Sequence, residues 1–381
     1  MSVWMYLVQT LLVSVVILIL LRNQHWVLRL QTLIWIAAVS VIALYYGLSE
    51  QLRFYSNDQV FYNDIVRNFS RDTQVLDVDW WMSLSRLPYT LPAFVLYSIG
   101  ISPALALKTV SLICLLWLTN DVLKNVQTRT SSRTLVACLL TACGTIGSFY
   151  SALALRETMM MLLTTRFFIT RSPATRLSVI VLLYLLRPHL SVSLAVAAVI
   201  SAAWRHARGR RPESVLTVSS FVIAGSWIGY WLYSFGNSYL ASAIGQFGHT
   251  WGIQPVTRIV SNFFGVQFLT ARSETVEFSL LSLVLLRLTL VETVLIPTLF
   301  TLLVFMKPHR LNEQRTTLLL AFTIYVGLVT NTDFNSFRQN IPFMTSMGLA
   351  VLAMLPDRRS MSGSPGTELR PSLPIGDRVR S

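Results

Sequence analysis

A polar stretch between long apolar runs carries the residues best suited to chemistry. Between Glu50 and Arg86 lie six of the 17 acidic residues, with Asp58, Tyr62 and Asp64 close together. Asp58 and Tyr62 are four positions apart, so on a short helix they share one face. A carboxylate beside a membrane can act as a general base on a sugar hydroxyl or hold a divalent cation. We expect Asp58 to be catalytic and Tyr62 and Asp64 to contact substrate; the alternative is a solvated loop whose aspartates cap helices.

Four further ionisable residues lie within or beside apolar runs. Arg156-Glu157 opens one such run, and Arg187 and His189 flank Pro188 at a break in the next. Ionisable side chains at membrane depth are costly and usually face a protein interior or a wet cavity, and the planar fork of arginine suits phosphate or diphosphate. We expect Arg187 to be catalytic and Arg156, Glu157 and His189 to bind substrate. The alternative is a structural ion pair between Arg156 and a carboxylate.

The polar segment 331–340 contains two further candidates, Arg338 and Asp333, shortly before Pro342. We expect Arg338 to be a second catalytic anion ligand and Asp333 to contact substrate. The long segment 236–277 is either an amphipathic lid over the site or a plain interfacial segment. No metal-ligand spacing is present, and the three cysteines fall in apolar runs as buried small hydrophobes. No cofactor is predicted, and a divalent cation held by the acidic loop is the one alternative.

The elements that position these residues are predicted to be membrane helices. The chain of 381 residues is 53% hydrophobic and only 13% charged, with a net charge of +14, which places it outside the usual range of soluble domains. The positive charge lies in short clusters between apolar runs and in the tail, the pattern of cytoplasmic loops and not of a nucleic-acid-binding surface. The first run lacks the basic start and cleavage site of a signal peptide, so we expect it to be a membrane helix.

The apolar runs predict an all-α, polytopic membrane protein with about ten or eleven membrane segments. Proline disfavours helix in the residue before it, so we expect one run to be a re-entrant hairpin with Arg187-Pro188-His189 at its tip. A single crossing is the alternative. Repeated Pro and Gly in Leu87–Pro103 predict interfacial or re-entrant helices. The expected segments are Val3–Leu21, Leu30–Leu48, Ala104–Thr119, Thr134–Tyr150, Arg156–Thr170, the broken run Leu177–Ala203, Ser214–Phe235, Phe278–Met306, Thr316–Thr330 and Ile341–Leu355.

Charge asymmetry predicts the orientation of these segments. Basic residues are concentrated on one set of connecting loops, which the positive-inside rule assigns to the cytoplasm. This leaves the N-terminus and the acidic loop (50–103) outside and the C-terminus inside. We expect residues 1–355 to form one transmembrane domain and residues 356–381, rich in Ser, Pro, Gly and Arg, to be a disordered basic cytoplasmic tail.

The order of these features resembles the polytopic glycosyltransferases of the GT-C superfamily and the related bacterial O-antigen (polysaccharide repeat-unit) polymerases. The resemblance covers most of residues 50–355 and is carried by four features in sequence order. They are the early outer loop with Asp58-Gln59 and Tyr62, the Arg156-Glu157 run, the Leu185-Leu186-Arg187-Pro188 break, and Arg338 before Pro342. It implies that Asp58 acts as a base or metal contact. Two departures are that Gln59 replaces the second of the usual pair of adjacent acids, and that an extra apolar run precedes the loop.

The resemblance implies an enzyme of cell-envelope glycan assembly in the bacterial inner membrane. Its substrate would be a polyprenyl-(pyro)phosphate-linked sugar, and its partners would be the bilayer and other glycan-assembly membrane proteins. Arg156, Arg187 and Arg338 would stabilise the departing lipid phosphate. A lipid-linked oligosaccharide flippase or another transporter is the alternative from a different class, although no internal repeat is evident. A non-catalytic membrane scaffold is a third possibility.

Overall fold

A computed structural model describes residues 3–53, 57–69, 86–127, 147–148, 151–154, 156–170, 172–208, 295–305, 313–330 and 341–354. Secondary structure in these ranges is helical, without a strand. The predicted all-α class is therefore confirmed for the described part of the chain. Several predicted segments lie outside the described part. They are Thr134–Tyr150 (apart from residues 147–148), Ser214–Phe235, the segment 236–277 and the tail 356–381.

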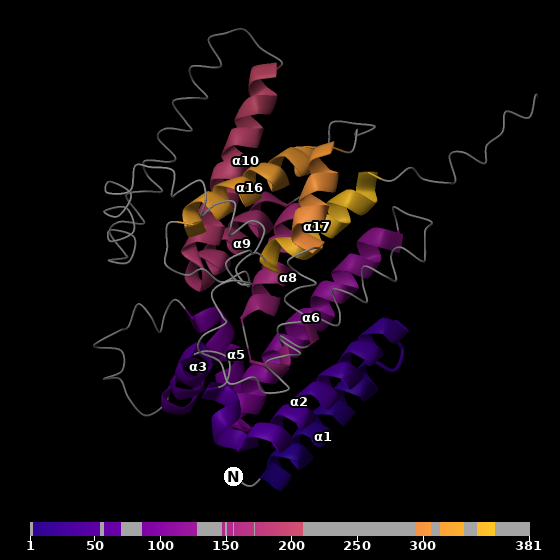
Figure 1. The fold of residues 1–381 in the computed structure, drawn as a ribbon, viewed down its shortest axis with the longest axis vertical. Helices are drawn as coiled ribbons and strands as arrows, with labels where there is room; N and C mark the ends of the chain where they lie inside the picture. The colour runs from indigo at the N-terminus through magenta and orange to yellow at the C-terminus, as the bar shows by residue number, and fades with distance from the viewer. Residues whose placement is uncertain are drawn as a thin grey trace, which may run out of the picture.

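Three described helices are long and apolar enough to cross a membrane. They span Val3–Leu20, Trp26–Leu44 and Pro103–Val126, within α1 (Val3–Leu20), α2 (Trp26–Arg53) and α6 (Pro103–Gln127). Figure 1 shows α1, α2 and α6 side by side along one edge of the molecule, and all three are in contact. These helices support a membrane protein, whereas the larger predicted total of ten or eleven segments stays a prediction.

The surface of α1 is the reverse of a soluble helix. Its buried positions are Tyr6, Thr10 and Ser14, spaced four residues apart, while Trp4 and Leu20 are about three-quarters exposed. The Thr10 and Ser14 hydroxyls donate to the carbonyls of Tyr6 and Thr10, at 2.9 and 2.6 Å, so these two hydroxyls are satisfied within the helix. A helix of a soluble protein buries its apolar face. A helix in lipid commonly turns polar or small residues toward the protein and apolar side chains toward the lipid, as α1 does.

The predicted acidic loop is partly helical. Helix α2 continues to Arg53, and α3 (Asn57–Asn68) follows it, so Asp58 and Tyr62 do lie on one helix. After Arg86, α5 (Leu87–Ser98) is a single helix with Pro88 in its first turn and Pro92 inside. Pro is compatible with the first helical turn because the missing N–H has no intrahelical acceptor there. The segment predicted to hold interfacial or re-entrant helices thus contains one short helix, and its placement at the membrane stays a prediction.

Helix α8 (Glu157–Ile169) occupies the middle of the bundle, as Figure 1 shows, and packs against α6, α9 and α17. Ten of its 13 residues are buried. At about 1.5 Å per residue it is roughly 20 Å long, shorter than a hydrocarbon core of about 30 Å. Its neighbour α17 (Ile341–Met354) packs against it, and the Thr165 and Ser346 hydroxyls of the two helices lie 3.4 Å apart. Such residues let helix backbones approach closely.

The predicted break at Arg187 is confirmed. Helix α9 (Pro173–Leu186) ends there and α10 (Pro188–Arg208) begins one residue later, with Arg187 in an extended conformation. The Ser191 hydroxyl donates a 2.7 Å hydrogen bond to the Ile180 carbonyl, 11 residues earlier in the chain. A continuous helix would separate these residues by about 16 Å, so the chain reverses at Arg187 as the hairpin predicts. Helix α16 (Glu313–Thr330) packs along α10.

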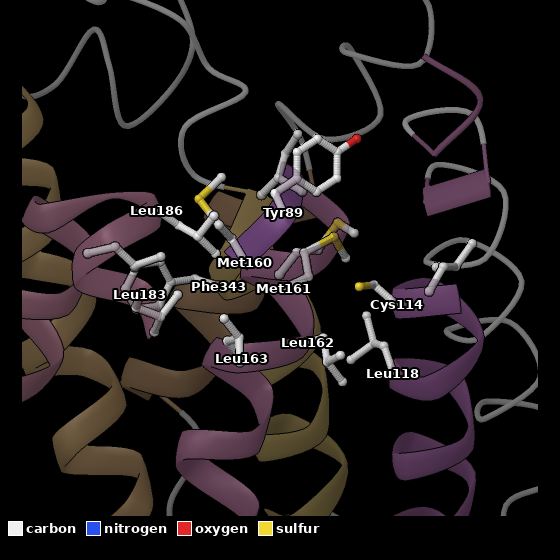
Figure 2. Close-up of a cluster of buried hydrophobic side chains, with 14 of the residues drawn as sticks. Tyr89, Cys114, Leu118, Met160, Met161, Leu162, Leu163, Leu183, Leu186 and Phe343 are labelled. Carbon is white, nitrogen blue, oxygen red and sulfur yellow. The ribbon is translucent and has the colours of Figure 1, made fainter. Parts of the chain in front are cut away.

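A sulfur-rich apolar core surrounds the N-terminal half of α8. Figure 2 shows Met160 and Met161 below Tyr89 of α5, between side chains of α9 and α17 on one side and of α6 on the other. Methionine fills irregular gaps between helices that meet at different angles. The flanking core residues are Leu183, Leu186, Phe343, Cys114 and Leu118.

Candidate functional site

The start of α8 is tied to the end of α9 by Arg156. Its Nη1 donates a 2.7 Å hydrogen bond to the carbonyl of Leu186, the last residue of α9. Helix C-terminal carbonyls lack intrahelical donors, and a guanidinium there also interacts favourably with the helix dipole. The same guanidinium lies 6.0 Å from the centre of the Tyr62 ring. Arg156 therefore joins α8, α9 and α3 at one point.

Tyr62 is completely buried and links α3 to α5 and α6. Its ring meets that of Tyr89 edge to face, with centroids 5.4 Å apart and planes at 75°, a favourable geometry for aromatic pairs. The Tyr89 hydroxyl donates to the Leu107 carbonyl at 3.2 Å and lies 2.8 Å from the Ser111 hydroxyl, both on α6. The Tyr62 ring is thus held rigidly beside Arg156.

Arg187 lies at the α9–α10 break and contacts α16. Its Nη1 donates a 3.2 Å hydrogen bond to the hydroxyl of Tyr325, which is completely buried. The Tyr325 ring packs against Phe343, in the first turn of α17, with centroids 5.3 Å apart. The guanidinium is therefore positioned by α16, and α16 in turn by α17.

Glu157 is a completely buried carboxyl in the first turn of α8. It lies within electrostatic range of the hydroxyls of Tyr89 and Tyr325, and Arg156 and Arg187 act on the same Tyr325 hydroxyl. A buried carboxylate is tolerated only where charges and hydrogen bonds compensate its lost hydration. We call Tyr62, Arg156, Glu157, Arg187 and Tyr325 the arginine–tyrosine cluster. It gathers four predicted site residues from segments far apart in sequence.

The other predicted site residues have different positions. His189 is half-buried in the first turn of α10 and lies within electrostatic range of Arg187. Asp64 is exposed on α3, two residues and about 200° of helix beyond buried Tyr62. Asp58 lies one turn before Tyr62 on α3, and its side chain is not among those described. Asp333 and Arg338 lie outside the described residues, between the end of α16 and the start of α17.

Two residues beside or within the cluster, Arg86 and Tyr325, were not predicted as site residues. The Arg86 guanidinium lies 4.6 Å from the centre of the Phe61 ring and 5.9 Å from that of Tyr62. A signal for Arg86 existed: like Arg187, it directly precedes a proline-containing helix start. Tyr325 sits in an ordinary apolar run and offered no signal, because its partner is 138 residues distant.

The remaining polar features are separate from the cluster. No group of three or more His, Cys, Asp or Glu side chains that could hold a metal ion occurs among the described residues, and the predicted divalent cation stays a prediction. A small cavity of about 30 Å³ lies at the opposite end of α8, lined in part by Asn125, Thr165, Gln314 and Ser346. This cavity is therefore separate from the arginine–tyrosine cluster at the start of α8.

The cluster brings two guanidiniums and a buried carboxyl to one end of α8, beside aromatic rings that fix their positions. This arrangement suits binding of an anionic group such as a phosphate, since arginine donates paired hydrogen bonds to phosphate oxygens. Comparison of the chain with protein-family models, curated proteins and solved structures finds no match.

Proposed function

We propose that this chain is a membrane enzyme of cell-envelope glycan assembly. It transfers or polymerises sugars carried on a polyprenyl phosphate or diphosphate, at the outer face of a bacterial inner membrane. The observation that supports the proposal is that Arg187 donates a hydrogen bond to the Tyr325 hydroxyl, while Arg156 and the buried Glu157 lie within electrostatic range of the same hydroxyl. Two arginines positioned by separate helices can together bind a phosphate.

The chemistry of sugar transfer matches such a site. The bond between the anomeric carbon and the phosphate oxygen of the lipid breaks, and the lipid phosphate leaves with the bonding electron pair. An acceptor hydroxyl forms the new bond to the anomeric carbon and loses its proton to a base. In this proposal Arg156 and Arg187 stabilise the charge that develops on the departing phosphate, and Asp58 accepts the proton.

The surrounding helices suit a lipid-linked substrate. The outward face of α1 is apolar, with Trp4, Leu12 and Leu20 all more than half exposed, and α2 and α6 are long enough to span a bilayer. A polyprenyl chain can remain in the hydrocarbon while its phosphate reaches the cluster. This placement makes the bilayer the partner that delivers the substrate.

Transport of a lipid-linked oligosaccharide is the second candidate, and buried charge on α6 favours it. Lys108 is 1% exposed and Asp121 pairs with Arg166 of α8 at 2.8 Å, thirteen residues further along α6. Ionisable residues at both ends of a helix that is long enough to span are a feature of substrate pathways. The two candidates differ in whether a sugar–phosphate bond is broken.

The length distribution of lipid-linked glycan in cells lacking this chain separates the candidates. Collapse of the ladder to a single repeat unit identifies a polymerase, and loss of one sugar from every unit identifies a transferase. If the wild-type gene restores the normal ladder and the Arg187→Gln variant does not, the activity depends on the arginine–tyrosine cluster. An unchanged ladder contradicts the proposal.

A further inference from the structure

The turn between α1 and α2 combines exposed basic side chains with an exposed tryptophan. Arg22 lies two residues after the end of α1, and Trp26 and Arg29 lie in the first turn of α2; all three are exposed. The sequence contains no acidic residue before Glu50. Basic residues beside tryptophan are typical of a helix end that lies among the headgroups of a membrane.

Local hydrogen bonds fix the course of this turn. The Gln24 amide donates to the Leu21 carbonyl at 3.0 Å, and the Val27 amide donates to His25 Nδ1 at 3.3 Å. His25 thereby satisfies an amide at the start of α2 that has no intrahelical acceptor. Because the turn is this short, Arg22 and Arg29 both lie within about one helical turn of the tip of the α1–α2 hairpin. Figure 1 shows α1 and α2 joined at this tip, at the right of the view.

One face of α2 is exposed from the turn onward. Exposed positions recur there every three or four residues, a spacing that keeps them on one side of a helix. They are Trp26, Arg29, Leu30, Leu33, Ala37, Val41 and Leu44. Intervening positions such as Trp35 and Val39 are completely buried in the core of the protein. The exposed face of α2 is therefore basic and aromatic at the turn and apolar beyond it.

A phospholipid has the same order of polarity as this face. Its phosphate lies at the membrane surface, and its acyl chains fill one half of a hydrocarbon core that is about 30 Å thick. Half of that thickness corresponds to about ten residues of helix, so Leu30, Leu33 and Ala37 lie at the depth of the acyl chains when Arg29 lies at the phosphate. Arginine can donate paired hydrogen bonds to phosphate oxygens while its apolar stem stays along the hydrocarbon.

We propose that the tip of the α1–α2 hairpin binds the phosphate of an anionic phospholipid of the bilayer, whose acyl chains lie along the exposed face of α2. Arg22 and Arg29 contact the phosphate, and Trp26 lies at the boundary between headgroup and acyl chains. A zwitterionic phospholipid brings its own positive charge to the headgroup, so the site prefers an anionic lipid. Neither arginine belongs to the arginine–tyrosine cluster, and this inference does not depend on the proposed sugar transfer.

The test is binding of defined phospholipids to the full chain purified in a neutral detergent. Dioleoyl phosphatidylglycerol and dioleoyl phosphatidylcholine are titrated separately while thermal unfolding is followed, because a ligand that binds the folded state raises the unfolding temperature. The two lipids have the same acyl chains, so the ratio of their affinities reports on the headgroup. We expect the wild type to bind phosphatidylglycerol about 10- to 25-fold more tightly, roughly fivefold for each arginine near the phosphate. The double variant Arg22→Gln/Arg29→Gln is expected to bring this ratio close to one.

Single variants control for net charge and for folding. Arg29→Gln is expected to lower the ratio about fivefold. Arg67→Gln removes the same charge from an exposed position at the end of α3 and is expected to leave the ratio at its wild-type value. Arg22→Gln is expected to match Arg29→Gln and carries the test should a variant at Arg29 not fold.

The deacylated headgroup separates a lipid site from a simple anion site. Glycerophosphoglycerol carries the phosphate diester of phosphatidylglycerol without its acyl chains. It is expected to protect the wild type only at concentrations more than about 100-fold higher than the intact lipid, because each CH₂ group that leaves water contributes to lipid binding.

Three results would overturn the inference. Equal wild-type affinities for the two phospholipids would show that no anionic headgroup is selected. Equal losses of preference in Arg29→Gln and Arg67→Gln would reduce the effect to overall charge. Protection by glycerophosphoglycerol at the concentrations of the intact lipid would show an anion site that makes no use of the exposed face of α2. Each of these results leaves the proposed sugar transfer, which depends on Arg187, to its own test.

Discussion

The guanidinium of Arg156 donates a 2.7 Å hydrogen bond to the carbonyl of Leu186, thirty residues later in the chain. This contact holds the start of α8 against the end of α9, so it sets the position of Arg187, the next residue after the carbonyl. The two arginines of the candidate site are therefore mechanically coupled: one guanidinium orients the backbone that carries the other.

Loss of this contact is expected to affect stability and the position of Arg187 together. Arg156→Met leaves the Leu186 carbonyl without its charged donor and is expected to lower the free energy of unfolding by about 1.5 to 3 kcal/mol. Denaturant unfolding of the purified chain measures the change. Arg156→Lys, which can still donate one hydrogen bond, should recover part of it, and equal stabilities of wild type and Arg156→Met would show that the bond contributes nothing.

The aromatic ring of Tyr62 is expected to contribute more to the stability of the fold than the Tyr62 hydroxyl does. Tyr62→Leu removes the edge-to-face contact with Tyr89 and the surface beside Arg156, whereas Tyr62→Phe keeps the ring. A double-mutant cycle of Tyr62→Leu and Tyr89→Leu should give a coupling free energy of about 0.5 to 1.5 kcal/mol, as for other aromatic pairs. Additive effects of the two substitutions would mean that the rings do not stabilise each other.

The ion pair between Asp121 and Arg166 is predicted to be structural. The Arg166 Nε lies 2.8 Å from an Asp121 carboxylate oxygen, and its guanidinium stacks 3.8 Å from the centre of the Trp117 ring. The side chains are 14% and 29% exposed for Asp121 and Arg166, so solvent weakens the pair. Asp121→Asn is expected to cost about 1 to 3 kcal/mol of stability.

The same substitution is expected to leave glycan assembly intact, because Asp121 lies ten residues, or about 15 Å, along α6 from Ser111 at the candidate site. Stability and the glycan ladder are measured on the same Asp121→Asn strain and protein. A well-folded Asp121→Asn protein without activity would place this pair in the functional pathway and favour transport.

Helix α1 is expected to depend on Gln9 for its attachment. The Gln9 side chain donates to the Gly100 carbonyl at 3.1 Å and accepts from the Ser102 amide at 3.2 Å, bridging α1 to the turn between α5 and α6. Gln9→Leu removes both bonds and is expected to lower stability by about 1 to 3 kcal/mol, since two backbone groups lose their partners.

Limited proteolysis of α1 in the purified chain reports on this attachment. Gln24→Leu is the matched control, because Gln24 is exposed in the turn between α1 and α2. Faster cleavage of Gln9→Leu than of Gln24→Leu is the predicted result, and equal cleavage would contradict the role of Gln9.

Local sequence signals predicted the elements but not all of their contacts. The break at Arg187-Pro188 was predictable because proline interrupts a helix at short range. The spans within α1, α2 and α6 were predictable because they are defined by length and apolar composition. The helical character of Asn57–Asn68 was weaker in sequence, since its polar residues are equally typical of a loop.

The meeting of Arg187 with Tyr325 and of Arg166 with Asp121 could not be predicted. The partners in each pair come from segments far apart in the sequence, and helix packing decides which of many buried residues face each other. Arg166 is anchored by an acid of α6.

The proposed function is best tested by the rate at which purified protein in lipid vesicles releases the lipid carrier from a polyprenyl-linked sugar. We expect release that depends on a sugar acceptor. We also expect Arg187→Gln to lower kcat by about 100- to 1000-fold, the effect of removing one group that stabilises developing charge. A wild-type protein that releases no carrier, or a folded Arg187→Gln protein that turns over at the wild-type rate, would contradict it.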